Sequence, residues 1–551
     1  MSMSSGIVQE LLNVTFWLWF FLLAIIFAVH LDAYFIDSHR IRRNGISGPF
    51  LARFSGAWLG WVVFQGRQSE VVHSLHKKFG TFVRLSPNHV SISDPDALRL
   101  VYGRGNGALK SDYYDAFLAV RPSIFTTRSK EEHARKRTAI AHAFSQKSVL
   151  EFEPYIRLHV AELFNQWDRM CNRGKNGLSG TEGEGGWIGQ GGRVWFDIMP
   201  WFHYLAFDVM SDLAFGASFG MVRNAKDAAP IAVDQRAAMA QYQGTRVDSL
   251  DLEKPSIDVK EVPAVTMLNA HIKVSARMAA VPPRWRPILQ RLPCFARDMR
   301  ASEDLVALAV AAVARRLVFP AERIDVLSKL QETEDEHGRV SNMEDLTTDA
   351  FTQLVAGSDT VSSTACGIAH CVAANSRVRA KLQQELDVVF GGSYDPVATY
   401  AQIKRLPYLE AVIIEGLRVH STSGLGLPRT VPNGGLIVCG KWFSEGTVLS
   451  VPTYTIHRDP IVWGEDADAF RPDRWFERDQ TILQKAFSPF SFGPRACIGR
   501  ELAIMELCIF VSSIFHRYDL ELEAPDKPLT IREDFIRKPV ACRVGMKRRN
   551  I

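Results

Sequence analysis

One cysteine near the C-terminal end, Cys497, constrains this 551-residue chain more than any other feature. It lies in the segment FSFGPRACIGR, residues 490–500, and an apolar helical pattern begins at Ile498. A thiol just before a helix lies at the positive end of the helix dipole, which favours the thiolate. Gly493 and Gly499 permit a tight backbone whose N–H groups can point at the sulfur. The loop therefore favours a sulfur held for ligation over an ordinary buried cysteine.

The remaining cysteines give no competing explanation for this loop. The chain has eight cysteines, which are scattered and form no CxxC pair. A zinc site or a disulfide framework is therefore not expected, and the sparse distribution fits a reducing compartment. The formal net charge of +5 comes without any long basic run, so the sequence gives no support for nucleic-acid binding.

The N-terminal residues have the pattern of a membrane anchor. Residues 11–29 read LLNVTFWLWFFLLAIIFAV without a charge, and a helix that crosses the hydrocarbon core needs roughly 20 such residues. No basic segment precedes this run, which argues against a cleaved signal peptide. Arg40, Arg42 and Arg43 follow it, so the positive-inside rule places the rest of the chain in the cytosol. We expect residues 1–36 to form a single-pass anchor and residues 37–551 to form one globular domain.

Periodicity in the globular part predicts a mainly α fold with a small β part, an α+β class. Residues 173–193 are rich in glycine, and we expect them to form a flexible surface insertion. Helical spacing of apolar residues covers 68–79, 131–147, 197–216, 299–317, 344–374 and 376–390, whereas strand patterns cover 81–93 and 435–451.

The cysteine loop resembles the haem-binding loop of the cytochrome P-450 superfamily. The pattern F-x-x-G-x-R-x-C-x-G is complete at Phe490, Gly493, Arg495, Cys497 and Gly499. The resemblance implies a haem b whose iron is ligated by the Cys497 thiolate, a soft ligand that favours O–O bond cleavage. Phe490 would shield the ligand, and Arg495 would pair with a haem propionate. Residues 37–551 would then be the haem-thiolate catalytic domain.

A second motif lies upstream, within the helix pattern at 344–374. Residues 356–360 read AGSDT and resemble the oxygen-activating motif of the same superfamily. Gly357 would thin the helix and open a groove for dioxygen. Asp359 and Thr360 would relay protons during oxygen activation, which makes them the expected catalytic residues.

Two further motifs match the superfamily in the expected order. Glu415 and Arg418, in EGLR, share a helix face, and FRPDRW at 470–475 supplies Arg474. The resemblance implies a structural charge network around the cysteine loop. An isolated exposed helix pair would contribute little.

Three other positions match residues that hold the haem propionates. His133 and Arg137, in HARKR, correspond to a W/H-x-x-x-R motif with His in place of the commoner Trp. Arg429, in LPRT, matches a further propionate-binding position. Arginine can form charge-assisted hydrogen bonds with a carboxylate.

A closer likeness connects the chain with the fungal benzoate para-hydroxylases. That group resides on the endoplasmic reticulum membrane and takes electrons from NADPH-cytochrome P-450 reductase, with cytochrome b5 as a candidate second partner. The implied location is that membrane, with a cytosolic catalytic domain. The segments that carry the likeness are 48–55, 71–80, 83–95, 107–117, 143–156 and 201–221.

The resemblance implies hydroxylation of a small aromatic substrate, benzoate or a derivative, at the para position with dioxygen. Benzoate needs a buried anion site, and we hypothesise that Arg121 and Ser123 hold its carboxylate. Three alternatives stay open: tailoring of another aromatic substrate in secondary metabolism, a haem-thiolate isomerase acting on peroxides, and a haem-binding membrane protein without catalysis. The complete AGSDT motif favours oxygen activation over the last two.

Overall fold

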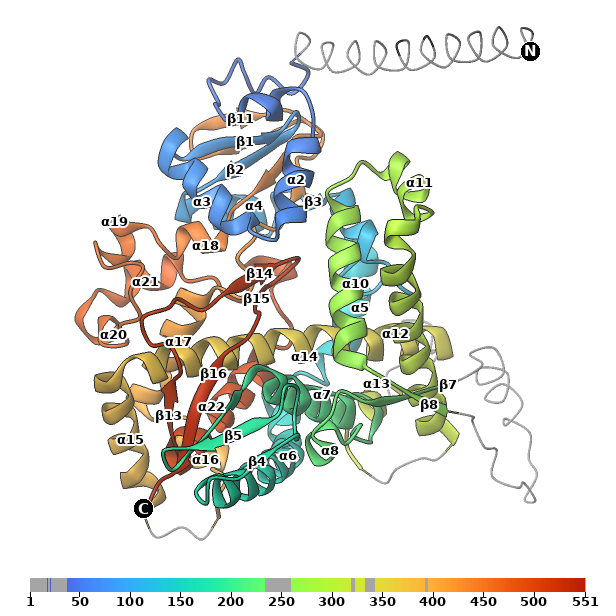
Figure 1. Ribbon diagram of the computed structural model, residues 1–551. Coiled ribbons are helices and arrows are strands. Elements are labelled where there is room, and N and C mark those ends of the chain that lie inside the picture. The colour runs from blue at the N-terminus through green and yellow to red at the C-terminus, as the bar shows by residue number, and fades with distance from the viewer. Residues whose placement is uncertain are drawn as a thin grey trace, which may run out of the picture.

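The computed structural model describes residues 37–232, 259–318, 323–331, 342–391 and 395–550, together with Trp17 and Phe20. This part of the chain is mainly helical, with small sheets at its edges (Figure 1). The predicted anchor, residues 1–36, lies outside the described residues apart from those two aromatic positions. Among the residues described, no helix is both long and apolar enough to cross a bilayer.

The central helix is α14, Met343–Ala374, which crosses the middle of the molecule (Figure 1). The Asn342 side chain caps it by accepting a hydrogen bond from the Asp345 backbone. It packs against α7 (Met199–Phe215), every residue of which is buried. A Cβ on Gly357 would collide with the Met210 side chain of α7. Gly357 therefore allows close packing between these helices, and it also lines the central cavity; the groove for dioxygen stays a prediction.

Glycine also brings α14 against α17, Pro407–His420. A Cβ on Gly367 of α14 would collide with the His420 ring, and one on Gly416 of α17 would collide with Ile368. The two helices thus approach through one glycine each. This contact matters for the site because α17 carries the predicted Glu415–Arg418 pair.

The sheet that includes the first strands of the chain places two basic residues side by side. Its strand order is β1 (Phe82–Ser86), β2 (His89–Ile92), β12 (Val448–Ser450), β9 (Arg429–Thr430) and β3 (Leu109–Lys110). In the antiparallel β3–β9 pair, Lys110 lies opposite Arg429. Two cations directly opposite each other repel, so this register needs a nearby anion or a strong hydrogen-bonding environment.

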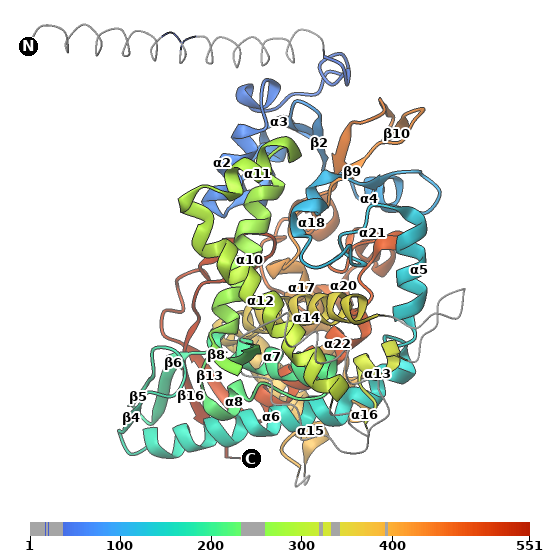
Figure 2. The ribbon, with the colours of Figure 1, turned by 90° about the vertical axis from the view of Figure 1, so that its right-hand side faces the viewer.

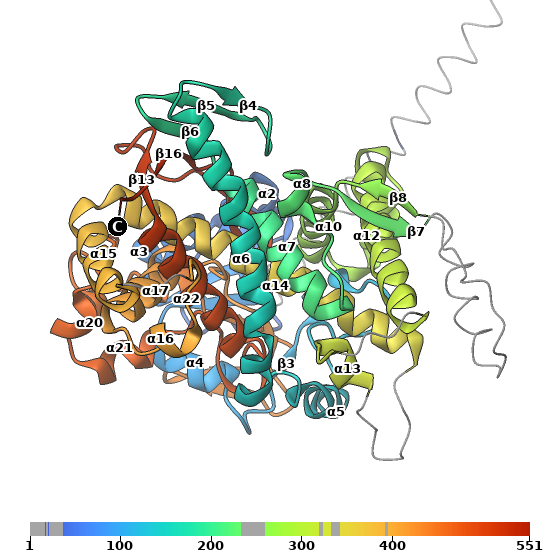
Figure 3. The same cartoon turned by 90° about the horizontal axis from the view of Figure 1, so that it is seen from below.

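The glycine-rich segment 173–193 is part of a second sheet, which corrects the expectation of an insertion without packed structure. The sheet runs β13 (Tyr518–Leu522), β16 (Arg543–Arg548), β6 (Arg193–Asp197), β5 (Trp187–Gln190) and β4 (Ser179–Gly180). Trp187 is only 2% exposed. Gly191 and Gly192, both with positive φ, form the two-residue turn between β5 and β6. The glycines thus serve tight turns at the end of α6 (Figure 3).

The predicted helix at 131–147 is two helices, α5 (Lys130–Ala141) and α6 (Gln146–Gly174). The Ser145 hydroxyl accepts a hydrogen bond from the Ser148 backbone and so caps a new helix at that point. The other predicted helices occur as α3 (Gln68–Phe79), α7, α12 (Pro293–Val318), α14 and α15 (Ser376–Phe390).

The remaining elements are short or lie at the periphery. The helices are α2 (Ala57–Gln65), α4 (Pro95–Tyr102), α8 (Met221–Asn224), α10 (Ala264–Ala279), α11 (Arg286–Gln290), α13 (Val326–Gln331), α16 (Tyr400–Ile403), α18 (Thr453–Ile456), α19 (Pro460–Trp463), α20 (Arg474–Glu477), α21 (Gln480–Ala486) and α22 (Arg500–Arg517). The 3₁₀ helices are η1 (Phe50–Arg53), η2 (Asp112–Phe117), η3 (Pro283–Trp285) and η4 (Gly493–Arg495). Paired strands are β7 (Ala229–Ala232) with β8 (Val259–Val262), β10 (Leu436–Val438) with β11 (Lys441–Phe443), and β14 (Ile531–Glu533) with β15 (Arg537–Pro539).

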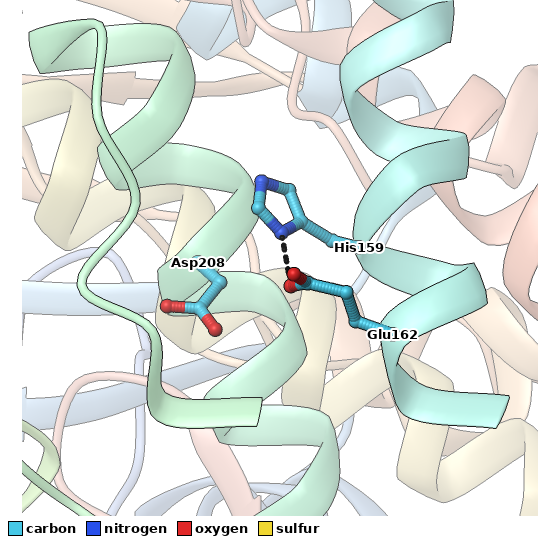
Figure 4. A group of neighbouring side chains, drawn as sticks. All are labelled: His159, Glu162 and Asp208. Carbon is cyan, nitrogen blue, oxygen red and sulfur yellow. Dashed lines mark hydrogen bonds and ion pairs between the residues drawn. The ribbon is translucent and has the colours of Figure 1, made fainter. Parts of the chain in front are cut away.

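A buried histidine of α6, His159, contacts carboxylates of α6 and α7, and Figure 4 shows it beside Glu162 and Asp208. His159 contacts Asp212 at 3.0 Å and Glu162 at 3.3 Å. Asp208 lies beside them and accepts hydrogen bonds from two backbone N–H groups of α8. Burial alone would lower the pKa of His159, but the hydrogen bonds with Asp212 and Glu162 raise it to about 9. Arg223 and Arg323 balance the remaining negative charge. The cluster is therefore a charge-compensated clamp between helices.

We predict that His159 makes stability depend on pH. Its folded pKa of about 9 exceeds the ordinary 6.5, so its contribution is complete below pH 6.5 and is lost as the pH rises through 9. His159→Gln should lower the free energy of unfolding by roughly 3 kcal/mol at pH 6. The gap from wild type should close by pH 9.5. Urea unfolding across this range measures it, with exposed His142→Gln as control. A gap independent of pH would contradict the assignment.

Candidate active site

A cavity of about 340 Å³ lies between α14 and the loop that carries Cys497. Asp359 and Thr360 of α14 line it, as do Phe490, Arg495 and Cys497 from the loop. The structure thus brings together residues that are at least 130 positions apart in the sequence. Gly499, His133, Arg137, Arg121 and Ser123 line the same cavity.

Cys497 lies at the N-terminal end of α22, which begins at Arg500, two residues later than the sequence suggested. Its backbone N–H donates to the Phe490 carbonyl at 2.9 Å, which closes the loop. Burial raises the pKa of the Cys497 thiol, whereas the Gly499 N–H, Arg137 and Arg500 lower it. A bound metal cation deprotonates a coordinating thiol outright. Burial has the larger effect and leaves the pKa of the thiol above its ordinary value, so a bound metal cation would be needed to make Cys497 a thiolate, assisted by the Gly499 N–H, Arg137 and Arg500.

The two glycines of the loop have different functions. Gly493 has a φ of 72°, and a Cβ there would collide with the Tyr102 carbonyl oxygen. No other residue type fits both constraints. Gly499 has an ordinary negative φ and caps α22. A side chain at Gly499 would meet only the Phe144 ring at 3.9 Å, so its small size keeps the cavity open.

Basic side chains gather along one edge of the cavity. His133 and Arg137 come from α5, Lys110 from β3 and Arg495 from η4. Arg137 donates to the Ala496 carbonyl at 2.8 Å, and Arg495 donates to the Thr127 and Ser129 carbonyls at 3.0 Å. Within the described part of the chain, none of these four forms an ion pair with an acidic side chain. The edge therefore requires an anion.

The pKa values in this group show the same excess of positive charge. Burial, then Arg495 and Lys110, lower the pKa of His133 to about 3. Burial followed by Arg429 and Arg495 lowers the pKa of Lys110 well below its ordinary value. Arg429 does not line the cavity but donates to the Tyr114 hydroxyl at 2.7 Å. Two carboxylates at this edge would relieve the repulsion. A thiolate ligand on the cavity floor and a cationic edge together fit a haem with its two propionates.

Thr360 and Asp359 have different partners on α14. The Thr360 hydroxyl donates to the Ala356 carbonyl at 2.6 Å, so its oxygen can still accept from the cavity. Asp359 is buried, with Lys538 in contact and His203 Nε2 at 3.7 Å. Burial would raise the pKa of Asp359, but Lys538 and His203 hold it below its ordinary value. Asp359 is therefore an ionised carboxylate held by two bases.

Lys538 extends this contact beyond α14. It lies on β15, and its Nζ also contacts the Asn269 side chain of α10. Neither Lys538 nor His203 stands out in the sequence, because each is far from AGSDT and belongs to no recognisable spacing. If Asp359 is buried, its carboxylate needs a partner. That argument predicts a basic residue nearby but does not identify which one.

The predicted charge network is buried and fully hydrogen-bonded. Arg418 donates to both oxygens of Glu415 at 2.8 and 2.9 Å, and Arg474 donates to Glu415 Oε1 at 2.8 Å. The Trp475 indole N–H donates to the other oxygen at 3.0 Å. The side chains of Glu415, Arg418 and Arg474 are 0% exposed. The Glu415–Arg418 pair is therefore not an exposed helix pair, which would contribute little to stability.

Glu506 is a cavity residue that the sequence analysis missed. It lies on α22, and burial raises the pKa of its carboxyl to about 8. The signal available was one acidic residue inside an apolar helix pattern, which also occurs at many solvated positions.

The comparisons with known proteins agree with this geometry. The cytochrome P-450 family model matches residues 49–546. The chain is 40% identical over 519 residues to "Benzoate 4-monooxygenase bphA" of Aspergillus niger, covering 93% of this chain and 94% of that protein. It is 27% identical over 516 residues to "Cytochrome P-450 monooxygenase gsfF" of Penicillium aethiopicum, covering 92% and 94%.

The site is thus that of a haem-thiolate monooxygenase. The chain belongs to the cytochrome P-450 family, whose members bind haem through a cysteine thiolate. In this chain, the cysteine that meets the geometric requirements is Cys497.

We predict that Glu415→Gln lowers the free energy of unfolding by about 3–5 kcal/mol, because the buried Arg418 guanidinium loses its counter-ion and Arg474 keeps only Asp466. Glu410→Gln on the exposed face of the same helix is the matched control, with an expected change within about 0.5 kcal/mol. Urea unfolding of purified protein measures both. Equal, small effects would show that the network does not stabilise the fold.

We predict energetic coupling between Lys538 and Asp359. Lys538→Met should destabilise the protein because it removes the main partner of a buried carboxylate. The double variant with Asp359→Asn should recover part of the loss, which gives a coupling energy of about 1–3 kcal/mol in a double-mutant cycle. Thermal unfolding with calorimetry measures the four proteins. Strictly additive effects would show that the contact carries no energy.

Proposed function

We propose that this protein hydroxylates benzoate or a simple derivative at the para position, using dioxygen and electrons from NADPH-cytochrome P-450 reductase. The observation that carries the proposal is 40% identity across 93% of the chain to a benzoate 4-monooxygenase. The sequence motifs and the cavity that they line support the reaction class. When bound, the haem supplies the oxygen chemistry.

The cavity suits a small aromatic molecule. Apolar side chains that line it include Phe117, Ile124, Phe351 and Phe535. Such walls orient an aromatic ring through edge and face contacts. Most of the wall surface is apolar although polar side chains also line the cavity, so a polar substituent on the ring would decide the orientation of the substrate.

The residues of this chain have separate functions in the proposed reaction. Cys497 would bind the iron of a haem, and the basic edge formed with Arg137 and Arg495 would bind its propionates. Thr360 presents its own hydroxyl oxygen as a hydrogen-bond acceptor beside the reacting atoms. Asp359 accepts and releases protons when its contact with Lys538 opens.

Arg121 and Ser123 remain the proposed carboxylate-binding residues from the sequence, and both line the cavity. Arg121 contacts Glu344 and lies 3.9 Å from Asp345, so its charge is already balanced. The Ser123 hydroxyl accepts from the Phe125 and Thr126 backbone N–H groups at 3.2 Å. Binding a carboxylate here requires Arg121 to exchange its partner.

Electron delivery is proposed to come from NADPH-cytochrome P-450 reductase, with cytochrome b5 as a second candidate. Arg500 is exposed beside the cysteine loop, 3.8 Å from the exposed Glu501, and such a weak surface pair can be exchanged for an acidic protein partner. Lys485, a second exposed basic residue on α21, contacts Asp96. The contact face that fits a donor is therefore the one nearest Cys497.

We propose a location on the endoplasmic reticulum membrane with the catalytic domain in the cytosol. The apolar run of the sequence at residues 11–29 is the first support for this location. In addition, large apolar side chains are exposed on η1 and α2, namely Phe50, Leu51, Trp61 and Phe64. Trp285 and Ile288 are exposed at η3 and α11. These elements lie toward the end of the molecule at which residue 37 begins (Figures 1 and 2). Exposed apolar groups of this kind suit a lipid surface.

Flotation with liposomes tests this location. We predict that the full chain floats completely, that removal of residues 1–36 leaves partial binding, and that Trp61→Glu with Ile288→Glu in the shortened chain abolishes it. Exposed Val388→Glu is the control because α15 lies far from these elements. A shortened chain that never binds liposomes would show that the apolar surface has no part in membrane binding.

Reconstitution with the reductase, NADPH and benzoate tests the reaction. We predict a substrate-induced spin shift and 4-hydroxybenzoate as the product detected by mass. Cys497→Ser should abolish both product and the red-shifted carbon monoxide spectrum. Product formed without NADPH would favour the isomerase alternative. Turnover of other aromatic compounds without turnover of benzoate would favour a tailoring enzyme. No turnover of any aromatic compound tested would favour a non-catalytic haem-binding protein.

A further inference from the structure

The basic groups that line the cavity can be sorted by their partners. Four of them form the cationic edge, and Arg121 is paired with Glu344. The sixth, His271, lies outside the cationic edge and, among the described residues, also has no acidic partner. The full set is Lys110, Arg121, His133, Arg137, His271 and Arg495.

His271 lies on α10 and is 4% exposed. Its Nδ1 forms a hydrogen bond of 2.7 Å with the Ser302 hydroxyl of α12. Its ring meets the Phe351 ring of α14 edge-on, with centroids 5.5 Å apart. Within the described residues, Nε2 forms no hydrogen bond. The ring is therefore held in a fixed orientation from two helices while its second nitrogen is left available.

Among the described residues, no charged group affects the pKa of His271 noticeably. Burial alone lowers its pKa to about 4, so the imidazole is neutral at pH 7. Ser302 and Phe351, the side chains in contact with the ring, do not titrate in this range. When the Ser302 hydroxyl donates to Nδ1, the ring proton resides on Nε2. His271 then offers a hydrogen-bond donor to a cavity whose walls are mostly apolar.

We propose that His271 is the group that receives the carboxylate of an aromatic acid in this cavity. The proposal rests on the proposed function for the class of substrate. It differs from that function in naming α10, rather than the Arg121 loop, as the element that binds the anion.

The chemistry of the pair supports this assignment. A buried carboxylate needs both a hydrogen bond and a compensating charge. An imidazole that takes up one proton from solvent supplies both, because the carboxylate raises the pKa of the ring. One proton thus enters with each bound anion, and the pair is neutral overall. Arg121, already charged and paired, would take up none.

The position of α10 also suits para chemistry. The para C–H is the part of a benzoate farthest from its carboxylate, so the anion must be held away from the cysteine loop. Helices α10 and α22 lie on either side of α14 (Figure 1). An aromatic acid held from α10 therefore directs its far edge toward the loop before α22.

Optical titration of the haem-loaded ferric enzyme tests the proposal with benzoate and the neutral methyl benzoate. His271→Phe keeps an aromatic ring against Phe351 and removes the donor. We expect it to weaken benzoate binding at least tenfold and to leave methyl benzoate within twofold. His271→Gln retains a donor and should show an intermediate loss. Exposed His142→Phe is the matched control, with unchanged affinity for both ligands.

Calorimetry in two buffers of different ionisation enthalpy supplies a second measurement. At pH 7.5, wild type should take up about one proton per benzoate bound, and both His271 variants should take up none. A purely structural effect of the substitution would alter affinity for both ligands equally and leave proton uptake unchanged. Equal benzoate affinity in wild type and His271→Phe, or proton uptake retained in that variant, overturns the proposal.

Phenylacetate and 2-naphthoate separate this inference from the proposed function. If wild type binds these acids but not benzoate, the proposed substrate is wrong, and the same comparison with His271→Phe then decides the inference. If wild type binds only neutral aromatics, both fail. If benzoate is bound and hydroxylated equally in His271→Phe and is lost in Arg121→Ala, the inference fails and the proposed function stands.

Discussion

The buried carboxylate of Glu415 is the interaction on which the geometry of the site depends. It binds two guanidinium groups, and Arg418 continues to the His457 and Ala467 carbonyls at 2.6 Å. His457 Nε2 then accepts the Ser488 backbone N–H at 3.1 Å. Ser488 lies two residues before Phe490, whose carbonyl accepts the Cys497 N–H. Hydrogen bonds and short covalent stretches of chain thus connect α17 with the loop that carries Cys497. Charges so deeply buried have a high desolvation cost, and here every partner is fixed by a second contact.

The basic edge of the cavity shows the opposite electrostatic arrangement. At Glu415, positive and negative groups balance inside the protein, whereas Lys110, His133, Arg137 and Arg495 have no acidic partner among the described residues. The β3–β9 register even places Lys110 opposite Arg429. Such repulsion destabilises the protein unless an anion fills the edge. Haem binding and folding stability are therefore linked, since a ligand bound only by the folded state stabilises that state.

Features that depend on local sequence were predictable. The Cys497 loop and the Glu415–Arg418 spacing each place their functional atoms within one turn or one helix face. The contacts of Asp359 with Lys538 and His203 were not predictable, because they join α14 to residues 179 positions downstream and 156 upstream. The glycine-rich segment was misread for another reason. Composition does not distinguish glycines that loosen a chain from glycines that supply positive φ in hairpin turns. The break between α5 and α6 was missed because it depends on the hydroxyl of Ser145. Helix propensity gives a single serine less weight than the helical pattern on both sides of it.

Helix α10 connects the two halves of the proposed chemistry. Asn269 and His271 are two residues apart, so their side chains leave the helix in nearly opposite directions. Asn269 contacts Lys538, the counter-ion of Asp359, whereas His271 lines the cavity. A ligand that draws His271 inward therefore acts on the same rigid element that holds the Lys538 ammonium. Because Lys538 lies between Asn269 and Asp359, any displacement of α10 changes how strongly the carboxylate is held. In this arrangement, occupancy of the cavity and the availability of Asp359 for proton transfer depend on one helix.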